Sequence, residues 1–113
     1  MSRRIERVNS LLKREISFIV EREIKDPRLG FVTITHVECS KDLKHARVFF
    51  NFHSDDETTQ IEAILNRASG YIQGRLGERI RLRYTPKLEF VYDDTLERME
   101  RIDRLLKEED ENN

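Results

Sequence analysis

The chain has 113 residues, of which 21 are basic and 22 acidic, so its formal net charge is −1; 38% of the residues are charged and 37% are apolar. This length allows one domain with a single modest core, which excludes a deep active site between two lobes. No apolar run approaches the roughly 18 residues of a membrane span and the first residues are charged, so we expect no secretory signal and no membrane partner. The single cysteine, Cys39, excludes an internal disulfide and predicts a reducing compartment, the cytoplasm.

The charge is unevenly distributed. Residues 1–92 carry 17 basic and 13 acidic side chains, a net charge of +4, whereas residues 93–113 carry 4 basic and 9 acidic side chains, a net charge of −5. The last six residues, 108–113, include no apolar side chain and predict a disordered acidic tail, because such a segment cannot bury enough surface to offset its ordering entropy. A mildly basic body is compatible with a nucleic-acid partner but does not by itself establish one.

The first predicted element is an amphipathic helix over residues 3–24. Apolar side chains recur there every three or four positions, which is the spacing of one helix face. They are Ile5, Val8, Leu12, Ile16 and Ile19. Asp26-Pro27 ends the helix, because the residue before a proline is biased out of the helical region, and Gly30 then supplies a flexible joint.

Three further segments predict β-strands. Residues 31–39 are rich in β-branched side chains, and residues 46–52 and 88–92 alternate apolar and polar positions. The first two strands are joined by the polar residues 40–45, which suits an antiparallel hairpin. The second and third strands are joined through helices, which predicts a right-handed crossover.

A long helical pattern begins after residues 54–57, which resemble a capping box. Three glycines, Gly70, Gly74 and Gly77, lie inside this pattern. Each glycine costs roughly 1 kcal/mol relative to alanine in a helix interior. We therefore predict either two helices separated by a break or a helix whose backbone closely approaches another part of a structure.

These elements predict an α+β domain of two layers, a three-stranded sheet with helices on one face. Their order is helix, strand, strand, helix, helix, strand, followed by a C-terminal helix that residues 93–95 cap. We divide the chain into a domain of residues 1–94 and a terminal segment of residues 95–113, which consists of the C-terminal helix and the acidic tail.

No constellation for catalysis or metal binding is visible. His36, His45 and His53 are eight or nine positions apart and Cys39 has no Cys-x-x-Cys partner, so these spacings enforce no metal site. The chain has no Gly-x-Ser-x-Gly elbow and no phosphate loop, and its paired aspartates stand where helices begin. We therefore expect no enzymatic activity, no metal, no cofactor and no small-molecule substrate.

The most informative segment is residues 67–87, in which cations stand among glycines and two tyrosines, Tyr71 and Tyr84. The cations are Arg67, Arg75, Arg79, Arg81, Arg83 and Lys87. Backbone amides at a glycine-bearing helix junction can bind phosphate, and arginines add bidentate phosphate contacts and stack on unpaired bases. The segment is therefore typical either of an RNA-binding face or of a solvated basic face.

Four blocks of sequence, from about residue 3 to residue 108, resemble the ribosome-binding factor A family of bacteria. The blocks are Asp26-Pro27-Arg28-Leu29-Gly30, then Ser40-Lys41-Asp42-Leu43-Lys44-His45-Ala46-Arg47-Val48, then Ala68-Ser69-Gly70-Tyr71-Ile72, and finally Leu82-Arg83-Tyr84-Thr85-Pro86-Lys87-Leu88-Glu89-Phe90-Val91-Tyr92-Asp93. The resemblance implies a KH-like fold with type II order and no enzymatic activity. It also implies binding to free small (30S) ribosomal subunits and help in late maturation and processing of 16S rRNA, near its 5′-terminal helix.

That family replaces the Gly-x-x-Gly loop of KH domains by an Ala-x-Gly helix kink, which Ala68-Ser69-Gly70 match here. We hypothesise that the RNA-binding surface combines this kink with cations near it, at the start of the chain and around the loop between the first two strands. These cations are Arg3, Arg4, Arg7, Lys41, Lys44, Arg47, Arg67, Arg75, Arg79, Arg81, Arg83 and Lys87. The expected partners are the free 30S subunit and its 16S rRNA, with the protein acting as a monomer.

Three other functions remain open from the sequence. A general single-stranded RNA-binding KH module would bind short oligonucleotides without preferring small subunits. A protein-interaction adaptor would use the amphipathic helices and would bind with little dependence on salt. A small hydrolase has the least support, because no nucleophile–base pair is visible.

Overall fold

The computed structural model of the chain describes residues 3–29 and 31–111. The elements are α1 (Arg3–Arg22), the short 3₁₀ helix η1 (Pro27–Leu29), β1 (Val32–Cys39), β2 (His45–Phe52), α2 (Thr58–Arg67), α3 (Ser69–Arg79), β3 (Lys87–Tyr92) and α4 (Thr95–Glu111). This is the predicted order, with strand ends that differ from the prediction by one residue. The flexible joint predicted at Gly30 lies outside the described residues.

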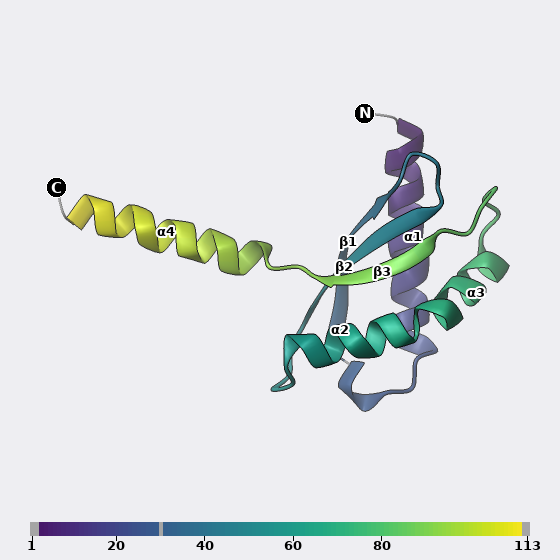
Figure 1. Cartoon of the computed structure of the whole chain (residues 1–113), viewed down its shortest axis with the longest axis horizontal. Helices are drawn as coiled ribbons and strands as arrows, with labels where there is room; N and C mark the ends of the chain where they lie inside the picture. Colours follow the sequence, from purple (N-terminus) through teal and green to yellow (C-terminus); the bar gives the residue numbers. More distant parts are fainter. Residues whose placement is uncertain (1–2, 30, 112–113) are drawn as a thin grey trace.

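The three strands form one sheet in the order β1-β2-β3 (Figure 1). β1 and β2 are antiparallel, with Val32 opposite Phe52. β2 and β3 are parallel, with His45 opposite Lys87. The predicted hairpin is therefore confirmed, and so is the parallel return to the sheet through α2 and α3.

One face of the sheet carries the core. α1 packs against β1, α2 and α3 pack against β3, and α1 also contacts α3, so these three helices form one layer. The largest fully buried side chains come from all of these elements: Leu12, Ile16, Ile19, Val37, Val48, Phe50, Ile61, Leu65, Ile72, Leu76, Pro86 and Phe90. The predicted α+β class, with three strands and helices on one face, is confirmed.

The long helical segment is divided at Ala68, as the glycines predicted. Ala68 has φ −85° and ψ −3°, and it is both the last cap of α2 and the first cap of α3. Its N–H is shared between the carbonyl oxygens of Ile64 and Leu65, each 3.1 Å away. The Ser69 hydroxyl donates to the carbonyl oxygen of Asn66 (2.8 Å), which stabilises the turn.

One glycine of α3 marks a close approach. A Cβ atom at Gly77 would lie only 3.0 Å from Oγ1 of Thr85, in the segment that links α3 to β3. Cβ atoms at Gly70 and Gly74 would meet nothing within 4 Å. Both alternatives predicted from the glycines therefore hold, a helix break at Ala68 and a close backbone approach at Gly77.

The capping box predicted at residues 54–57 is wrong. Glu57 is the N-cap of α2 and forms no side-chain cap hydrogen bond. Instead the hydroxyl of Ser54 donates to the carboxylate of Asp56 (3.1 Å) and accepts from its backbone N–H (3.2 Å). Short polar side chains readily form such local bonds in turns, and here this geometry replaces the cap.

α4 leaves the body after Asp93, whose carboxylate accepts from the backbone N–H (3.0 Å) and the hydroxyl (2.5 Å) of Thr95. The helix then extends away from the sheet and buries no side chain (Figure 1). Residues 108–111 continue this helix where we predicted a disordered tail, because glutamate is a good helix former even without a core to pack against. Residues 112–113 lie outside the described part of the chain.

Candidate nucleic-acid interface

Cations from three separate segments surround one surface hollow of about 330 Å³, which we call the basic hollow. Arg4 comes from α1, Lys41 and Lys44 from the β1–β2 loop, and Arg83 with Tyr84 from the α3–β3 segment. Asp42 and Leu43 complete the lining. Four cations face a single carboxylate, so the hollow is suited to a polyanion such as RNA.

The loop that presents Lys41 and Lys44 is held by its own contacts. Leu43 has a positive φ of 63° and buries its side chain in the core. The carboxylate of Asp42 accepts from the Ser40 hydroxyl (2.6 Å) and from the N–H of Lys44 (3.0 Å). These hydrogen bonds, first that from Ser40, lower the pKa of Asp42. Asp42 therefore acts as the charged centre of the turn, and the two lysines point outward from a fixed backbone.

The α3–β3 segment is fixed from both sides. The amide of Gln73 on α3 donates to the carbonyl oxygen of Thr85 (3.1 Å), and Pro86 is fully buried. The N–H of Lys87 donates to the carbonyl oxygen of Lys44 (2.8 Å), so the segment is also joined to the β1–β2 loop. This hydrogen bond brings Arg83 and Tyr84 beside the loop lysines.

Tyr84 lies among these cations with 42% of its surface exposed. The Lys44 ammonium and the Arg83 guanidinium each lie 5.5 Å from the centroid of its ring. Cations at this distance are attracted by the face of an aromatic ring. We noted Tyr84 in the sequence but did not include it among the predicted binding residues; its adjacency to Arg83, just before a buried proline, is the signal that could have singled it out.

The start of α1 continues the positive surface. Arg3, Arg7 and Arg14 line a second hollow along α1, together with one carboxylate, Glu6. The side chains of Arg3, Arg4 and Arg7 form no ion pair with any residue in 3–29 or 31–111. These three predicted residues are therefore available to an external anion.

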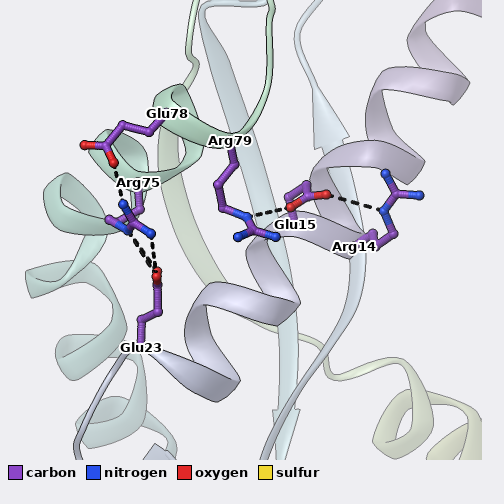
Figure 2. Close-up of polar contacts among 6 residues, drawn as sticks. All are labelled: Arg14, Glu15, Glu23, Arg75, Glu78 and Arg79. Carbon is purple, nitrogen blue, oxygen red and sulfur yellow. Dashed lines mark hydrogen bonds and ion pairs between the residues drawn. The ribbon is translucent and has the colours of Figure 1, made fainter.

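Two of the predicted arginines have internal partners instead (Figure 2). Arg75 donates to the carboxylate of Glu23, the residue directly after α1, at 2.7–3.1 Å and also to Glu78. Arg79 donates to Glu15 on α1 (2.7 Å). The hydrogen bonds from Arg75 hold the pKa of Glu23 below its ordinary value, and those to Glu23 raise the pKa of Arg75. These pairs fasten α3 to α1.

An aromatic ring strengthens this fastening. The guanidinium of Arg79 lies 4.2 Å from the ring centroid of Phe18 on α1, and that of Arg22 lies 5.2 Å from the same centroid. Such stacking adds to the hydrogen bonds because a guanidinium is weakly hydrated and planar. Sequence alone could not separate Arg75 and Arg79 from Arg83, because their carboxylate partners are more than fifty residues away.

The other predicted residues lie outside the basic hollow. Arg47 and Lys87 line a neighbouring hollow at the end of β2 and β3, where Glu89 lies 3.9 Å from Arg47. Arg67 ends α2 and donates to the carbonyl oxygen of Ala63 (3.3 Å). Arg81 is exposed. The kink residues Ala68, Ser69 and Gly70 lie at the opposite end of α3 from Arg83.

Two other kinds of site, a metal-binding cluster and a membrane-spanning helix, are absent from the described residues. Within residues 3–29 and 31–111, no group of three or more His, Cys, Asp or Glu side chains could hold a metal ion. None of the helices in this part of the chain is long and apolar enough to cross a membrane. Burial, and secondarily Asp42, raises the pKa of the Cys39 thiol, which disfavours a reactive thiolate.

Comparison with known proteins identifies the family. The profile of ribosome-binding factor A matches residues 4–106. The chain belongs to the ribosome-binding factor A family. Ribosome-binding factor A of Halothermothrix orenii is 49% identical over 105 residues, which cover 92% of this chain and 86% of that protein. The Nitrosococcus oceani protein of the same name is 43% identical over 104 residues, with coverage of 91% and 82%.

Solved structures of ribosome-binding factor A agree with this assignment. The crystal structure of the Thermus thermophilus protein superposes with a TM-score of 0.71 at 28% identity, covering 78% of this chain and 94% of that one. A homology model of the Thermus thermophilus protein, fitted into a cryo-electron-microscopy map of its 30S complex, superposes with a TM-score of 0.64 at 29% identity, covering 75% of this chain and 90% of that one. The resemblance read from the sequence blocks is confirmed.

Proposed function

We propose that this chain is a cytoplasmic assembly factor that binds the free 30S subunit and assists late maturation of its 16S rRNA, near the 5′-terminal helix. Membership of the ribosome-binding factor A family supports the partner, as does the 30S complex of the Thermus relative. The observation that carries the RNA contact is the basic hollow, where cations from three separate segments converge. The factor acts as a monomer and needs no cofactor.

The contact works by binding and not by chemistry. Cations that neutralise phosphates release condensed counterions, which gives strong and salt-dependent affinity. A bound factor shifts the folding of rRNA only as far as it binds one arrangement better than another. The backbone that carries the cations of the hollow is held in place by hydrogen bonds, so the hollow favours the rRNA arrangement whose phosphates come within reach of all of them.

We divide the predicted cations into contact residues and structural residues. Arg3, Arg4, Arg7, Lys41, Lys44 and Arg83 are proposed as the main contacts with rRNA. Arg47, Arg67, Arg81 and Lys87, together with the kink at Ala68, Ser69 and Gly70, are proposed as secondary contacts. Arg75 and Arg79 are proposed as structural residues, because their N–H groups are already directed to carboxylates of α1 and α3.

Complementation tests the function directly. A bacterial strain that lacks its own ribosome-binding factor A would receive either this chain or its Lys41→Gln/Lys44→Gln/Arg83→Gln variant. We expect the wild-type chain to lower the fraction of 16S rRNA with an unprocessed 5′ end, measured by primer extension on free 30S particles, and the variant to fail. Equal 5′ processing with the wild-type chain, the variant and an empty vector would contradict the proposal.

A further inference from the structure

Tyr84 is the one aromatic side chain that lines the basic hollow, and its position is fixed by its neighbours. The hydrogen bond from Gln73 to the carbonyl of Thr85 and the burial of Pro86 hold the backbone directly after Tyr84. The tyrosine itself stays 42% exposed. An exposed aromatic ring on a rigid backbone offers a stacking surface without a large entropic cost of ordering.

We propose that the basic hollow captures one unpaired nucleotide of RNA, with its base stacked on the Tyr84 ring and its phosphates bound by the surrounding cations. The proposal rests on the RNA-binding function proposed above and specifies what the hollow recognises. Lys44 and Arg83 lie 5.5 Å from the ring centroid, within reach of a phosphate that flanks a stacked base. On binding, the Lys44 ammonium exchanges its contact with the ring for one with phosphate.

The size and shape of the hollow favour an unpaired nucleotide over a duplex. Its volume, about 330 Å³, lies at the low end of the range of small-ligand pockets, which suits one nucleotide. In a duplex the faces of the bases are covered by their stacked neighbours, so a ring inside a hollow reaches only a base that has left the stack. A positive surface without such a ring would bind duplex and single strand through phosphates alone.

Tyr71 provides a matched control on the same protein. It is also an exposed tyrosine, with 52% of its surface accessible, but it lies in the first turn of α3, near the kink. Among the described residues no cation lies over its ring, in contrast to the two over Tyr84. The affinity lost on replacing Tyr84 can therefore be compared with the affinity lost on the same substitution at Tyr71.

The test measures binding of the full chain to two probes. One is a short uridine-only RNA strand with a single 2-aminopurine, and the other is a blunt-ended RNA duplex of similar length without unpaired nucleotides. For the single strand we expect Tyr84→Leu to weaken binding by about 5- to 150-fold, the usual effect of losing one stacked base. Tyr84→Phe and Tyr71→Leu should stay within about twofold of wild type, and the duplex affinity should change equally little with all three variants.

Fluorescence of the 2-aminopurine is measured with the wild-type chain, so this readout does not depend on whether a variant folds. Stacking of the 2-aminopurine on the Tyr84 ring should quench its fluorescence when the chain binds. Absence of quenching, or equal losses of affinity for Tyr84→Leu and Tyr71→Leu, would overturn the stacking proposal.

A charge variant separates this proposal from the proposed function. If Lys44→Gln/Arg83→Gln abolishes subunit binding while Tyr84→Leu changes the affinity for neither probe, the proposed function stands and only the nucleotide pocket is wrong. If the charge variant also leaves subunit binding unchanged, both fail.

Discussion

Two groups of cationic side chains have different surroundings in this protein. Arg75 and Arg79 on α3 lie at hydrogen-bond distance from carboxylates at the end of α1 and within it. Lys41, Lys44 and Arg83 surround the basic hollow, where Asp42 is the one acidic side chain in the lining. The first group joins two helices of the core layer, and the second group has its charge directed to solvent.

This difference shows that a cluster of arginines in the sequence does not by itself establish a binding site. What decides the role of each arginine is whether the fold supplies a carboxylate within reach. A paired arginine already donates to a carboxylate, so a phosphate has to compete with that carboxylate for it. Substitutions in one of the two groups should therefore leave the property that depends on the other group unchanged.

Neutralising the hollow should have the largest effect. In the triple variant Lys41→Gln/Lys44→Gln/Arg83→Gln we expect affinity for free 30S subunits to fall by about 100-fold near physiological salt, and the salt slope to decrease by about 2 to 3. Sedimentation binding at several salt concentrations measures both. The urea midpoint should change little, because exposed substitutions of this kind usually alter stability by less than about 0.5 kcal/mol.

The matched control neutralises the paired group. We expect Arg75→Gln/Arg79→Gln to keep 30S affinity within about threefold of wild type, once the binding is corrected for any unfolded protein. The salt slope should be unchanged. A loss of affinity equal to that of the triple variant would show that the paired arginines also bind rRNA, and the comparison between the two groups would collapse.

Breaking the pair between α1 and α3 should affect stability. Glu23→Gln and Arg75→Gln are each expected to lower the urea midpoint, because each removes the charged hydrogen bonds between the end of α1 and α3. The double variant should lose less than the sum of the two single losses, because the interaction is then removed from both sides. Additive losses would show that Glu23 and Arg75 are not energetically coupled.

Alanine at the glycines of α3 distinguishes the kink from the close approach. Gly70→Ala should stabilise the fold by about 0.5–1 kcal/mol, because the new Cβ meets nothing and the helix gains propensity. Gly77→Ala should not stabilise it, because the Cβ would lie 3.0 Å from Thr85. If the kink is a secondary rRNA contact, Gly70→Ala also weakens 30S binding several-fold; unchanged binding in the stabilised variant would remove the kink from the interface.

Acid should weaken the paired group and leave the hollow charged. The pKa of Glu23 is lowered in the folded protein, chiefly by the hydrogen bonds from Arg75. The ionised Glu23 therefore contributes fully to stability above its unfolded pKa of about 4.3. This contribution is lost as the pH falls through its pKa in the folded protein. The urea midpoint should therefore drop between about pH 5 and pH 3, less steeply in Glu23→Gln. Equal slopes in the two proteins would contradict this.

Much of the fold could be predicted from local signals. The apolar spacing of α1, the alternation in β2 and β3 and the break near Gly70 each reflect contacts between neighbours in the sequence. The candidate site could be predicted only as a set of cations. Which of these cations belong to the site depends on contacts between distant residues, such as the hydrogen bond from Lys87 to Lys44. It also depends on Asp42, whose carboxylate stabilises the turn of the basic loop. For residues 108–111 the structure has helix where we predicted disorder, because a segment without apolar side chains can still have a high helix propensity.

Leu43 connects binding to the folding of the whole domain. Among the described residues it is the one non-glycine residue with a positive φ, a conformation that costs roughly 1–2 kcal/mol and persists because the side chain is buried in the core. The loop that carries Lys41 and Lys44 therefore keeps its shape as long as the core does. We therefore expect the loop to melt only when the whole domain unfolds, so on warming the protein should lose rRNA affinity abruptly and together with its tertiary structure. Its association rate should be governed by diffusion and charge and not by a loop-ordering step.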